Sequence, residues 1–213
     1  MEKNTAKKLE NYTNEEQEIK KYTYADLLEM DDDKRYEIID GKLYLMSSPS
    51  ITHQAIAGEI YAQLREALKS KKCTPFIAPL DVALSKSKQE HKIFNVVQPD
   101  VMVVCDIKKL EDGKKVFGAP DFVIEILSPS TSRKDQLEKL NLYLKYKVKE
   151  YWIIDPENMW VWPYLLNEQG MYELGKVYEL TNEEVPVKVL KGCKINLIKY
   201  IEENKEWLLE KNN

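Results

Sequence analysis

Two long apolar runs dominate the hydrophobic pattern of the chain, and each of them carries one carboxylate. Residues 96–104 (VVQPDVMVV) contain Asp100, and residues 122–127 (FVIEIL) contain Glu125. Both runs are rich in β-branched residues and lack polar alternation, which predicts neighbouring strands in the middle of a sheet. An ionised carboxylate buried there without a partner would cost several kcal/mol. We therefore expect a cation beside Asp100 and Glu125.

A helix is expected soon after the second run, and Ser132 and Asp135 fit a capping box at its start. Its predicted buried stripe consists of Leu137, Leu140, Leu144 and Val148. Lys139 on this helix can supply the cation. The alternative is a surface ion pair between Asp135 and Lys139, worth a few tenths of a kcal/mol. That alternative leaves Glu125 without a partner.

An Asp-Gly pair between two apolar runs predicts a hairpin over residues 36–46, because Asp40 and Gly41 suit the positive φ angles of a type I′ turn. Glu37 and Ile39 share one face of this hairpin. That register leaves two interpretations of Glu37, an exposed strand acid or a partly covered one, and the pattern slightly favours the exposed acid.

The remaining pattern predicts helices alternating with short strands. A four-residue spacing of Ile56, Ile60, Leu64 and Leu68 indicates a helix over residues 53–70. Thr23 suits the N-cap of a short helix over 22–30. The other expected elements are a charged tail at 1–20, strands at 76–84, 151–154, 160–166, 172–180 and 185–190, and a helix at 197–209. This order predicts one mixed α/β domain over 21–213, with a central sheet flanked by helices, an N-terminal hairpin and C-terminal antiparallel strands.

Composition narrows the location and the partners. The chain has 213 residues and a net charge of −4, so a broad basic surface for nucleic acid is not expected, although a local basic rim or a metal could serve. No apolar run approaches the roughly 20 residues of a membrane span, and residues 1–18 lack the apolar segment of a signal peptide. The cysteines at 73, 105 and 193 are odd in number and far apart, which argues against disulfides and a cysteine zinc site. These features favour a cytoplasmic protein.

Several chemistries lack their motifs. Seven glycines form neither a dinucleotide-binding nor a P-loop pattern, two distant histidines form no H-E-x-x-H site, and no G-x-S-x-G elbow is present. Asp100 and Glu125 on neighbouring strands would lie about 4.8 Å apart and would recruit a cation. Mg²⁺ accepts one or two carboxylates, a carbonyl such as that of Ile126, and waters. Lys139 could then orient the attacking water or neutralise charge on a phosphate.

Three other residues are weaker candidates. Asp121 repeats the Pro-Asp dipeptide, but four strand residues span roughly 13 Å, so it cannot share an ion with Glu125 and is interpreted as a polar residue at the start of a strand. His53 is interpreted first as a surface or helix-end histidine and only secondly as a ligand. Asp81 lies on the predicted strand at 76–84.

These motifs resemble a known family. Pro99-Asp100 followed by Glu125 is similar to the PD-(D/E)xK nuclease superfamily. More closely, the stretches 36–41 (YEIIDG), 99–101 (PDV), 125–131 (EILSPST) and 148–156 (VKEYWIIDP) resemble the Uma-two family of restriction endonucleases. The resemblance extends over about residues 22–201.

The resemblance implies a restriction-endonuclease-like fold. It also implies a Mg²⁺-dependent endonuclease (Mn²⁺ is the second candidate ion) that cleaves DNA, commonly as a homodimer. Asp100 and Glu125 carry over as metal ligands. The superfamily's lysine stands two residues after the glutamate, where this chain has Leu127, so Lys139 would replace it. Glu37 resembles the additional N-terminal acid, and Asp81 could serve instead.

Two further interpretations stay open. The acidic balance and the missing Glu-x-Lys favour a nuclease-like fold that binds nucleic acid or protein without cleaving it. A structural role in assembly through Trp160 and Trp162 is the third.

Overall fold

The computed structural model describes residues 20–30, 33–128 and 133–208, with side chains from 137 onward in the third range. Residues 1–19 of the tail predicted at 1–20, and the predicted cap of Ser132 and Asp135, lie outside what is described. Within the described ranges, no helix is long and apolar enough to cross a membrane.

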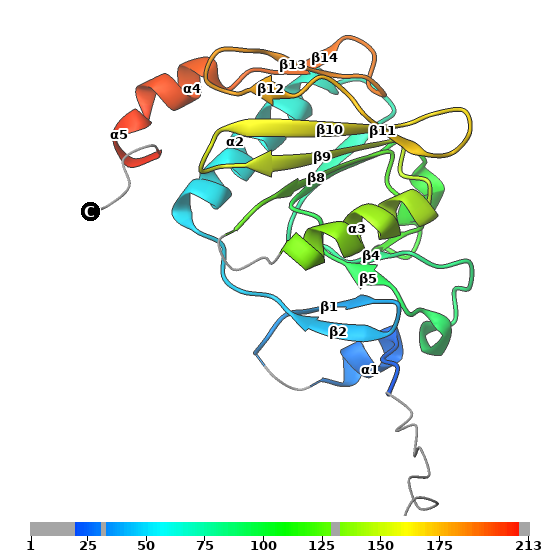
Figure 1. The fold of residues 1–213 in the computed structure, drawn as a ribbon. Coiled ribbons are helices and arrows are strands. Elements are labelled where there is room, and N and C mark those ends of the chain that lie inside the picture. Colours follow the sequence, from blue (N-terminus) through cyan, green and yellow to red (C-terminus); the bar gives the residue numbers. More distant parts are fainter. Residues whose placement is uncertain (1–19, 31–32, 129–132, 209–213) are drawn as a thin grey trace, which may run out of the picture.

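A seven-stranded mixed sheet forms the centre of the molecule (Figure 1). In spatial order its strands are β11 (Tyr172–Leu174), β10 (Trp160–Leu166), β9 (Glu150–Asp155), β8 (Phe122–Ile126), β6 (Val101–Val104) and β3 (Thr74–Ile77), with β12 (Tyr178–Glu179) also on β10. Strands β8 and β9 are parallel, and the other neighbours are antiparallel. The predicted mixed α/β architecture is confirmed.

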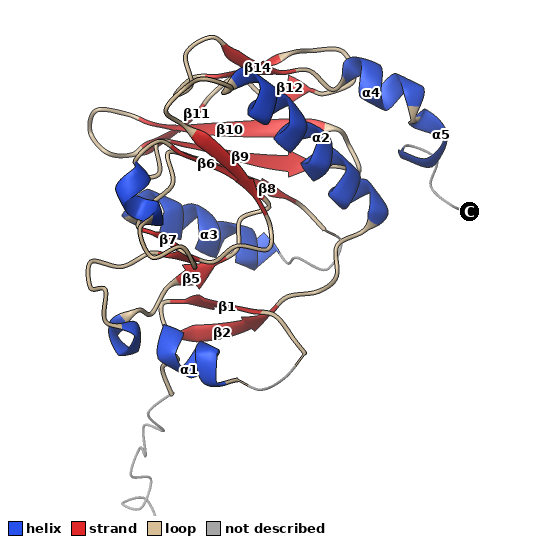
Figure 2. Cartoon of the chain, turned by 180° about the vertical axis from the view of Figure 1, so that it is seen from behind, coloured by secondary structure: helices blue, strands red, loops and turns tan. Residues whose placement is uncertain are grey.

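Two helices cover opposite faces of this sheet (Figures 1 and 2). Ile56, Ile60 and Leu64 of α2 (Ile51–Ala67) pack with Ile124 and other residues of the sheet's first face. Leu142 and Tyr143 of α3 (Arg133–Lys145) pack on the other face with Val123. Because side chains alternate along β8, Glu125 shares the face of Val123 and points toward α3.

A second sheet begins with the predicted hairpin. Its order is β2 (Lys42–Leu45), β1 (Tyr36–Ile39), β5 (Val96–Val97), β4 (Val82–Ala83) and β7 (Val116–Phe117). Asp40 and Gly41 have φ angles of +48° and +82°, as a type I′ turn requires. The remaining elements are α1 (Tyr24–Glu29), β13 (Val185–Val187), β14 (Cys193–Ile195), α4 (Ile198–Glu203), α5 (Lys205–Leu208) and the 3-10 turns Glu90–Lys92 and Ile107–Leu110. Thr23 caps α1, as predicted.

The prediction of one strand over residues 96–104 is wrong. The run divides into β5 in the second sheet and β6 in the main sheet. Pro99 lies at the division, where its missing N–H cannot continue a ladder. Asp100 therefore lies at the point where the chain passes from one sheet to the other.

Three other predicted elements are also divided. The strand expected at 76–84 becomes β3 and β4, with Pro79 between them. The C-terminal helix divides into α4, which ends at Glu203, and α5, which begins at Lys205. The strand expected at 172–180 becomes β11 and β12. The bounds of such short elements depend on which neighbouring strand or helix they pack against, and the apolar pattern of the sequence does not contain that information.

The predicted buried stripe of α3 is partly wrong. Leu137 is 57% exposed, whereas Leu142 and Tyr143 are buried. The covered face therefore follows residues 139, 142, 143 and 146, a helical period that includes a lysine. Leu140 and Val148 pack in the core as predicted, but the pattern missed Lys139, because a buried cation contributes nothing to a hydrophobic stripe.

The expectation of no disulfide is contradicted by a bond between Cys73 and Cys105. Thr74 pairs with Val104 in the antiparallel register of β3 and β6, so the next residues outward face each other. The 32-residue separation concealed this proximity. Cys193 is free and buried.

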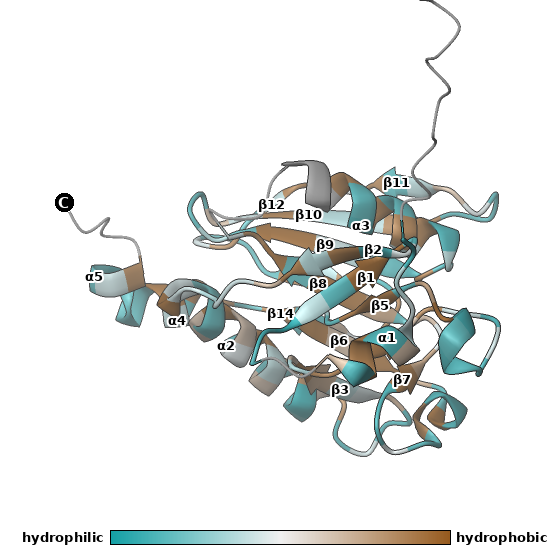
Figure 3. Cartoon of the chain, turned by 90° about the horizontal axis from the view of Figure 1, so that it is seen from below, coloured by the Kyte–Doolittle hydropathy of each residue, from teal (hydrophilic) through white to brown (hydrophobic). Residues whose placement is uncertain are grey.

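Figure 3 shows the apolar strands enclosed between more polar outer surfaces.

Candidate active site

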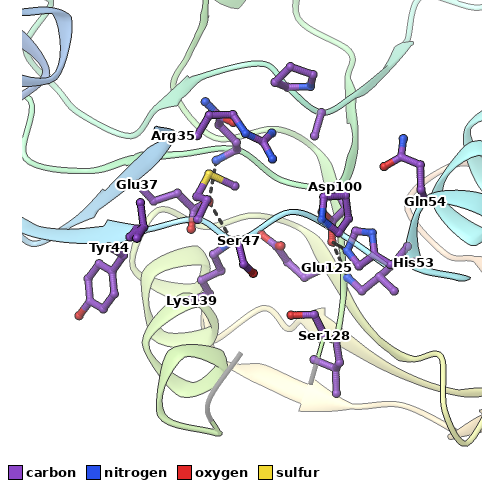
Figure 4. Close-up of a pocket in the computed structure, with 18 of the residues that line it drawn as sticks. Arg35, Glu37, Tyr44, Ser47, His53, Gln54, Asp100, Glu125, Ser128 and Lys139 are labelled. Atoms are coloured by element: carbon purple, nitrogen blue, oxygen red, sulfur yellow. Dashed lines mark hydrogen bonds and ion pairs between the residues drawn. The ribbon is translucent and has the colours of Figure 1, made fainter. Parts of the chain in front are cut away.

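A cavity of about 420 Å³ opens where the two sheets meet (Figure 4). The hairpin of β1 and β2, the start of α2, the ends of β6 and β8, and α3 all contribute to its wall. Among the lining residues are four that the sequence predicted for the site: Glu37, Asp100, Glu125 and Lys139. Ile126, predicted as a ligand through its carbonyl, also lines it.

Strand pairing brings Asp100 beside Glu125. Val101 pairs with Ile124 in the antiparallel ladder of β6 and β8, so Asp100 and Glu125 follow as the next opposed positions. The Ile126 N–H donates to Asp100 Oδ2 at 2.7 Å, and the Asp100 carbonyl accepts from the Ala78 N–H at 3.0 Å. These two hydrogen bonds fix both the side chain and the backbone of Asp100.

Glu125 is a buried acid with two donors. It is 9% exposed, and its Oε1 accepts from Lys139 Nζ at 2.9 Å and from the Tyr143 hydroxyl at 2.6 Å. Burial raises the pKa of Glu125 to about 7 against the attraction of Lys139, and the charges of Asp100 and Glu37 add to the rise. A carboxyl with this pKa gives up its proton readily when a cation arrives.

Lys139 joins two acids that are far apart in the sequence. Its Nζ lies 2.9 Å from Oε1 of Glu37 and 2.9 Å from Oε1 of Glu125, and its side chain is only 15% exposed. Figure 4 shows the side chain extending from α3 toward both carboxylates. Burial alone would lower the pKa of Lys139, but Glu125, Glu37 and Asp100 raise it above its usual value. Lys139 is therefore a buried ammonium, and the interpretation as a surface ion pair is wrong.

Glu37, for which the exposed interpretation was slightly favoured, is 6% exposed. Its Oε1 also accepts from the Gln98 N–H at 2.8 Å, so this carboxylate links the hairpin to the loop before Asp100. Asp81 takes a different position. It accepts from Gln98 Nε2 at 2.9 Å and from the Tyr24 hydroxyl at 3.2 Å. Of the two candidates for the additional acid, Glu37 contacts Lys139 and Asp81 does not.

The interpretation of His53 as a surface histidine is wrong. The residue is 7% exposed, and its Nε2 lies 3.1 Å from Asp100 Oδ2. Its position at the start of a helix was predictable, because Ser50 is a good N-cap, but nothing in the local pattern indicated burial. Pro49 and Ser50 direct the chain so that the first turn of α2 faces the cavity.

Asp121 lies outside this cluster. It is buried, and it accepts from the Cys105 N–H at 2.9 Å and from Lys149 Nζ at 2.6 Å. Burial would raise the pKa of Asp121, but Lys149 and the Cys105 N–H together hold it below its usual value. Its role in the structure is to join the start of β8 to the end of β6.

Comparisons with known proteins identify the family of the chain. The family model Uma2, described as "Putative restriction endonuclease", matches residues 22–197. The chain belongs to the Uma2 family. An uncharacterized protein of Synechocystis sp. is 25% identical over 138 residues, which are 64% of this chain and 69% of that protein.

A solved structure extends the likeness to the fold. The crystal structure of a protein from Anabaena variabilis, titled a putative nuclease belonging to DUF820, superposes with a TM-score of 0.66. It is 23% identical and covers 88% of this chain and 99% of that one. This structure shows the shared fold, and Uma2 membership supports a nuclease function.

Sequence reasoning missed three residues of this Uma2 site. Tyr143 follows Lys139 by four positions on α3, so helical spacing could have placed both on Glu125. Gln98 holds Glu37 through its backbone and Asp81 through its side chain. Arg35, just before β1, is exposed and lines the cavity (Figure 4). No short motif marks Gln98 or Arg35, because their roles depend on where the second sheet meets the first.

The donor set of this Uma2 site suits a particular kind of ion. Among the described residues, no three His, Cys, Asp or Glu side chains are grouped as a ready metal cluster. Asp100 uses Oδ2 and Glu125 uses Oε1 for the hydrogen bonds described above, and each has a second oxygen to offer. Mg²⁺ is commonly held by one or two carboxylates and several waters, whereas Ca²⁺ and structural Zn²⁺ require more protein ligands. The residues present therefore fit Mg²⁺.

Proposed function

We propose that this Uma2 protein is a Mg²⁺-dependent endonuclease that hydrolyses phosphodiester bonds in DNA. The observation that carries the proposal is the convergence of Asp100, Glu125 and Lys139 in one cavity, with Glu37 as the second acid on the lysine. A core built only for stability has no need for three acids around one cation. Family membership supports the same class of chemistry.

Each residue has a role that follows from its chemistry. Asp100 and Glu125 hold the Mg²⁺ (Mn²⁺ is the second candidate ion), and the carbonyl of Ile126 is the third ligand. A bound divalent ion activates a water and stabilises charge on the phosphate. Lys139 is an ammonium and so cannot act as a base. It orients the attacking water or neutralises charge on the phosphate, while Glu37 keeps it in place.

The proposal is tested by incubating the protein with single-stranded and double-stranded DNA in Mg²⁺ or Mn²⁺. We expect cleavage that EDTA stops and that added Mg²⁺ restores. Cleavage that persists in EDTA would contradict the metal-dependent mechanism.

One observation favours a second function, a nuclease-like fold that binds nucleic acid or protein without cleaving it. Lys139 already pairs with both Glu37 and Glu125, and the raised pKa of Glu125 lets that acid take up a proton, so both acids can be buried without a metal. Mg²⁺ titration by calorimetry separates the two functions. Binding in the millimolar range or tighter supports the endonuclease, and DNA binding without metal binding supports the second function.

The pKa of Glu125 predicts a stability cost in the metal-free protein. Glu125 titrates near pH 7 in the fold but near pH 4.5 when unfolded, so its ionisation destabilises the fold as the pH rises from 4.5 through 7. Glu125→Gln should therefore be more stable than wild type at pH 8, by up to about 3 kcal/mol, and equal to it at pH 4. Urea unfolding in EDTA at both values measures the difference. Equal stabilities at pH 8 would contradict the raised pKa.

Arg35 predicts where the substrate phosphate lies. Among the cations that line the cavity, Lys139 is paired with acids, whereas the described residues show no acid paired with Arg35. Arg35→Ala should raise KM for DNA about tenfold with little change in kcat, and should weaken the salt dependence of binding. Arg65→Ala, at an exposed position on α2 beside a separate hollow, is the control and should behave as wild type. Equal effects of both substitutions would mean that Arg35 has no specific contact.

A further inference from the structure

His53 is the buried histidine of the chain, and its backbone is fixed. The His53 N–H donates to Ser50 Oγ, the N-cap of α2, at 3.1 Å. Its ring then lies at the cavity, 7% exposed, beside Asp100 (Figure 4). The other histidine, His91, is exposed in a 3-10 turn and does not line this cavity.

The carboxylate of Asp100 is held through one oxygen. Oδ2 accepts from the Ile126 N–H at 2.7 Å and lies 3.1 Å from Nε2 of His53. Within the described ranges, no hydrogen bond to Oδ1 is found. An ionised carboxylate only accepts hydrogen bonds, so Nε2 of His53 must carry a hydrogen. A protonated nitrogen cannot at the same time be a metal ligand, so this contact makes His53 a donor to Asp100.

Packing alone does not account for a histidine at this position. Nδ1 of His53 is buried and has no hydrogen-bond partner among the described residues. A buried polar atom without a partner lowers stability. An apolar side chain of similar size would fill the space under α2 without that cost. What it could not do is donate to Asp100.

We propose that His53 is a positioning residue which, together with the Ile126 amide, holds Oδ2 of Asp100 and so presents Oδ1 to a divalent cation. The inference rests on the proposed function, because it assigns a role toward the metal of that site. The physical reason is preorganisation. A ligand carboxylate that is already held by hydrogen bonds does not have to be ordered when the ion binds, and loss of such a partner typically weakens metal binding 10- to 100-fold, roughly.

The test is Mg²⁺ titration by calorimetry on wild type, His53→Ala, His53→Gln and His91→Ala, with thermal unfolding of each protein measured in parallel. We expect about 10- to 100-fold weaker binding for His53→Ala. The Gln variant should recover most of the affinity, because its amide N–H can donate to Asp100. His91→Ala should match wild type. A merely structural histidine would change the unfolding temperature and leave the affinity of the folded protein unaltered.

The outcomes separate this inference from the proposed function. If wild type binds Mg²⁺ and His53→Ala binds it equally well, or if Gln recovers nothing, the role of His53 is overturned and the endonuclease proposal stands. If wild type binds no Mg²⁺, both are overturned.

A measurement on the wild-type protein covers the case in which the Ala variant does not fold. In ¹⁵N NMR spectra of the imidazoles, Nε2 of His53 should carry a hydrogen, and its signals should shift on addition of Mg²⁺ while those of His91 stay constant. A His53 Nε2 without a hydrogen, or a ring that does not respond when Mg²⁺ binds, would overturn the inference.

Discussion

Asp100→Ala is expected to abolish Mg²⁺ binding and to lower DNA cleavage by at least about a thousandfold. The magnitude follows from the several kcal/mol of transition-state charge stabilisation that a bound ion supplies, since about 4 kcal/mol corresponds to a thousandfold in rate. Asp100 lies where the chain crosses from β5 to β6, and Ile126 and His53 hold its carboxylate. Among the described acids, no other carboxylate contacts both the Ile126 N–H and His53 Nε2. Calorimetry and a DNA cleavage assay measure the two effects.

Asp121→Asn is the matched control, because Asp121 follows a proline in the same way as Asp100 and is buried, whereas Asp100 is half-buried. It loses an ion pair with Lys149 at the other end of β6 and should lower stability without changing Mg²⁺ affinity or cleavage by the folded protein. Cleavage by Asp100→Ala that equals wild type and resists EDTA would rule out the proposed metal site.

Lys139→Met is expected to have the largest effect on stability. It removes the cation between Glu37 and Glu125 and leaves two buried carboxylates without their charge partner. Breaking a buried ion pair in this way costs about 3 to 5 kcal/mol, which corresponds to a decrease of about 10 °C in Tm for a chain of this size. The loss should be greater at pH 8 than at pH 6, because Glu125 with its raised pKa becomes protonated and neutral at the lower pH. Cleavage should also fall by at least about 100-fold.

Lys145→Met on the same helix is the control for Lys139. Lys145 also pairs with an acid of the hairpin, Asp40, but its side chain is 54% exposed and that of Asp40 is 60% exposed. An exposed pair contributes at most about 1 kcal/mol, so this variant should unfold close to wild type. Calorimetric unfolding of both variants at the two pH values distinguishes a buried cation from a surface one. A Lys139 variant as stable as the Lys145 variant would mean that Lys139 does not hold the two acids together.

Several features were predictable because they depend on neighbours in the chain. The Asp40-Gly41 turn and the Thr23 cap are local, and the stripe of α2 follows one helical period. The prediction of Asp100 and Glu125 as neighbours came from the apolar runs that flank them, since two central strands of one sheet bring opposed residues together.

Other features required contacts between distant segments. Pro99 divides the run at 96–104, but only the pairing of β5 with β1 and of β6 with β8 shows that Asp100 lies between two sheets. The disulfide depends on the register of β3 and β6. His53 follows an ordinary helix cap, and its burial depends on α2 packing over the start of β6, next to Asp100. Hydrophobic pattern cannot report these contacts, because polar residues in a site are covered by segments that lie elsewhere in the sequence.

The sequence by itself determined the fold class, the hairpin, the helix stripe of α2 and the two strand-borne acids, because periodicity and turn chemistry act over a few residues. The tertiary structure decided which charges meet. It placed Lys139 between Glu37 and Glu125, removed Asp81 and Asp121 from the cluster, and brought His53 to Asp100. The physical reason is that the energy of a buried charge depends on what surrounds it in space, and strand register and helix packing set those surroundings.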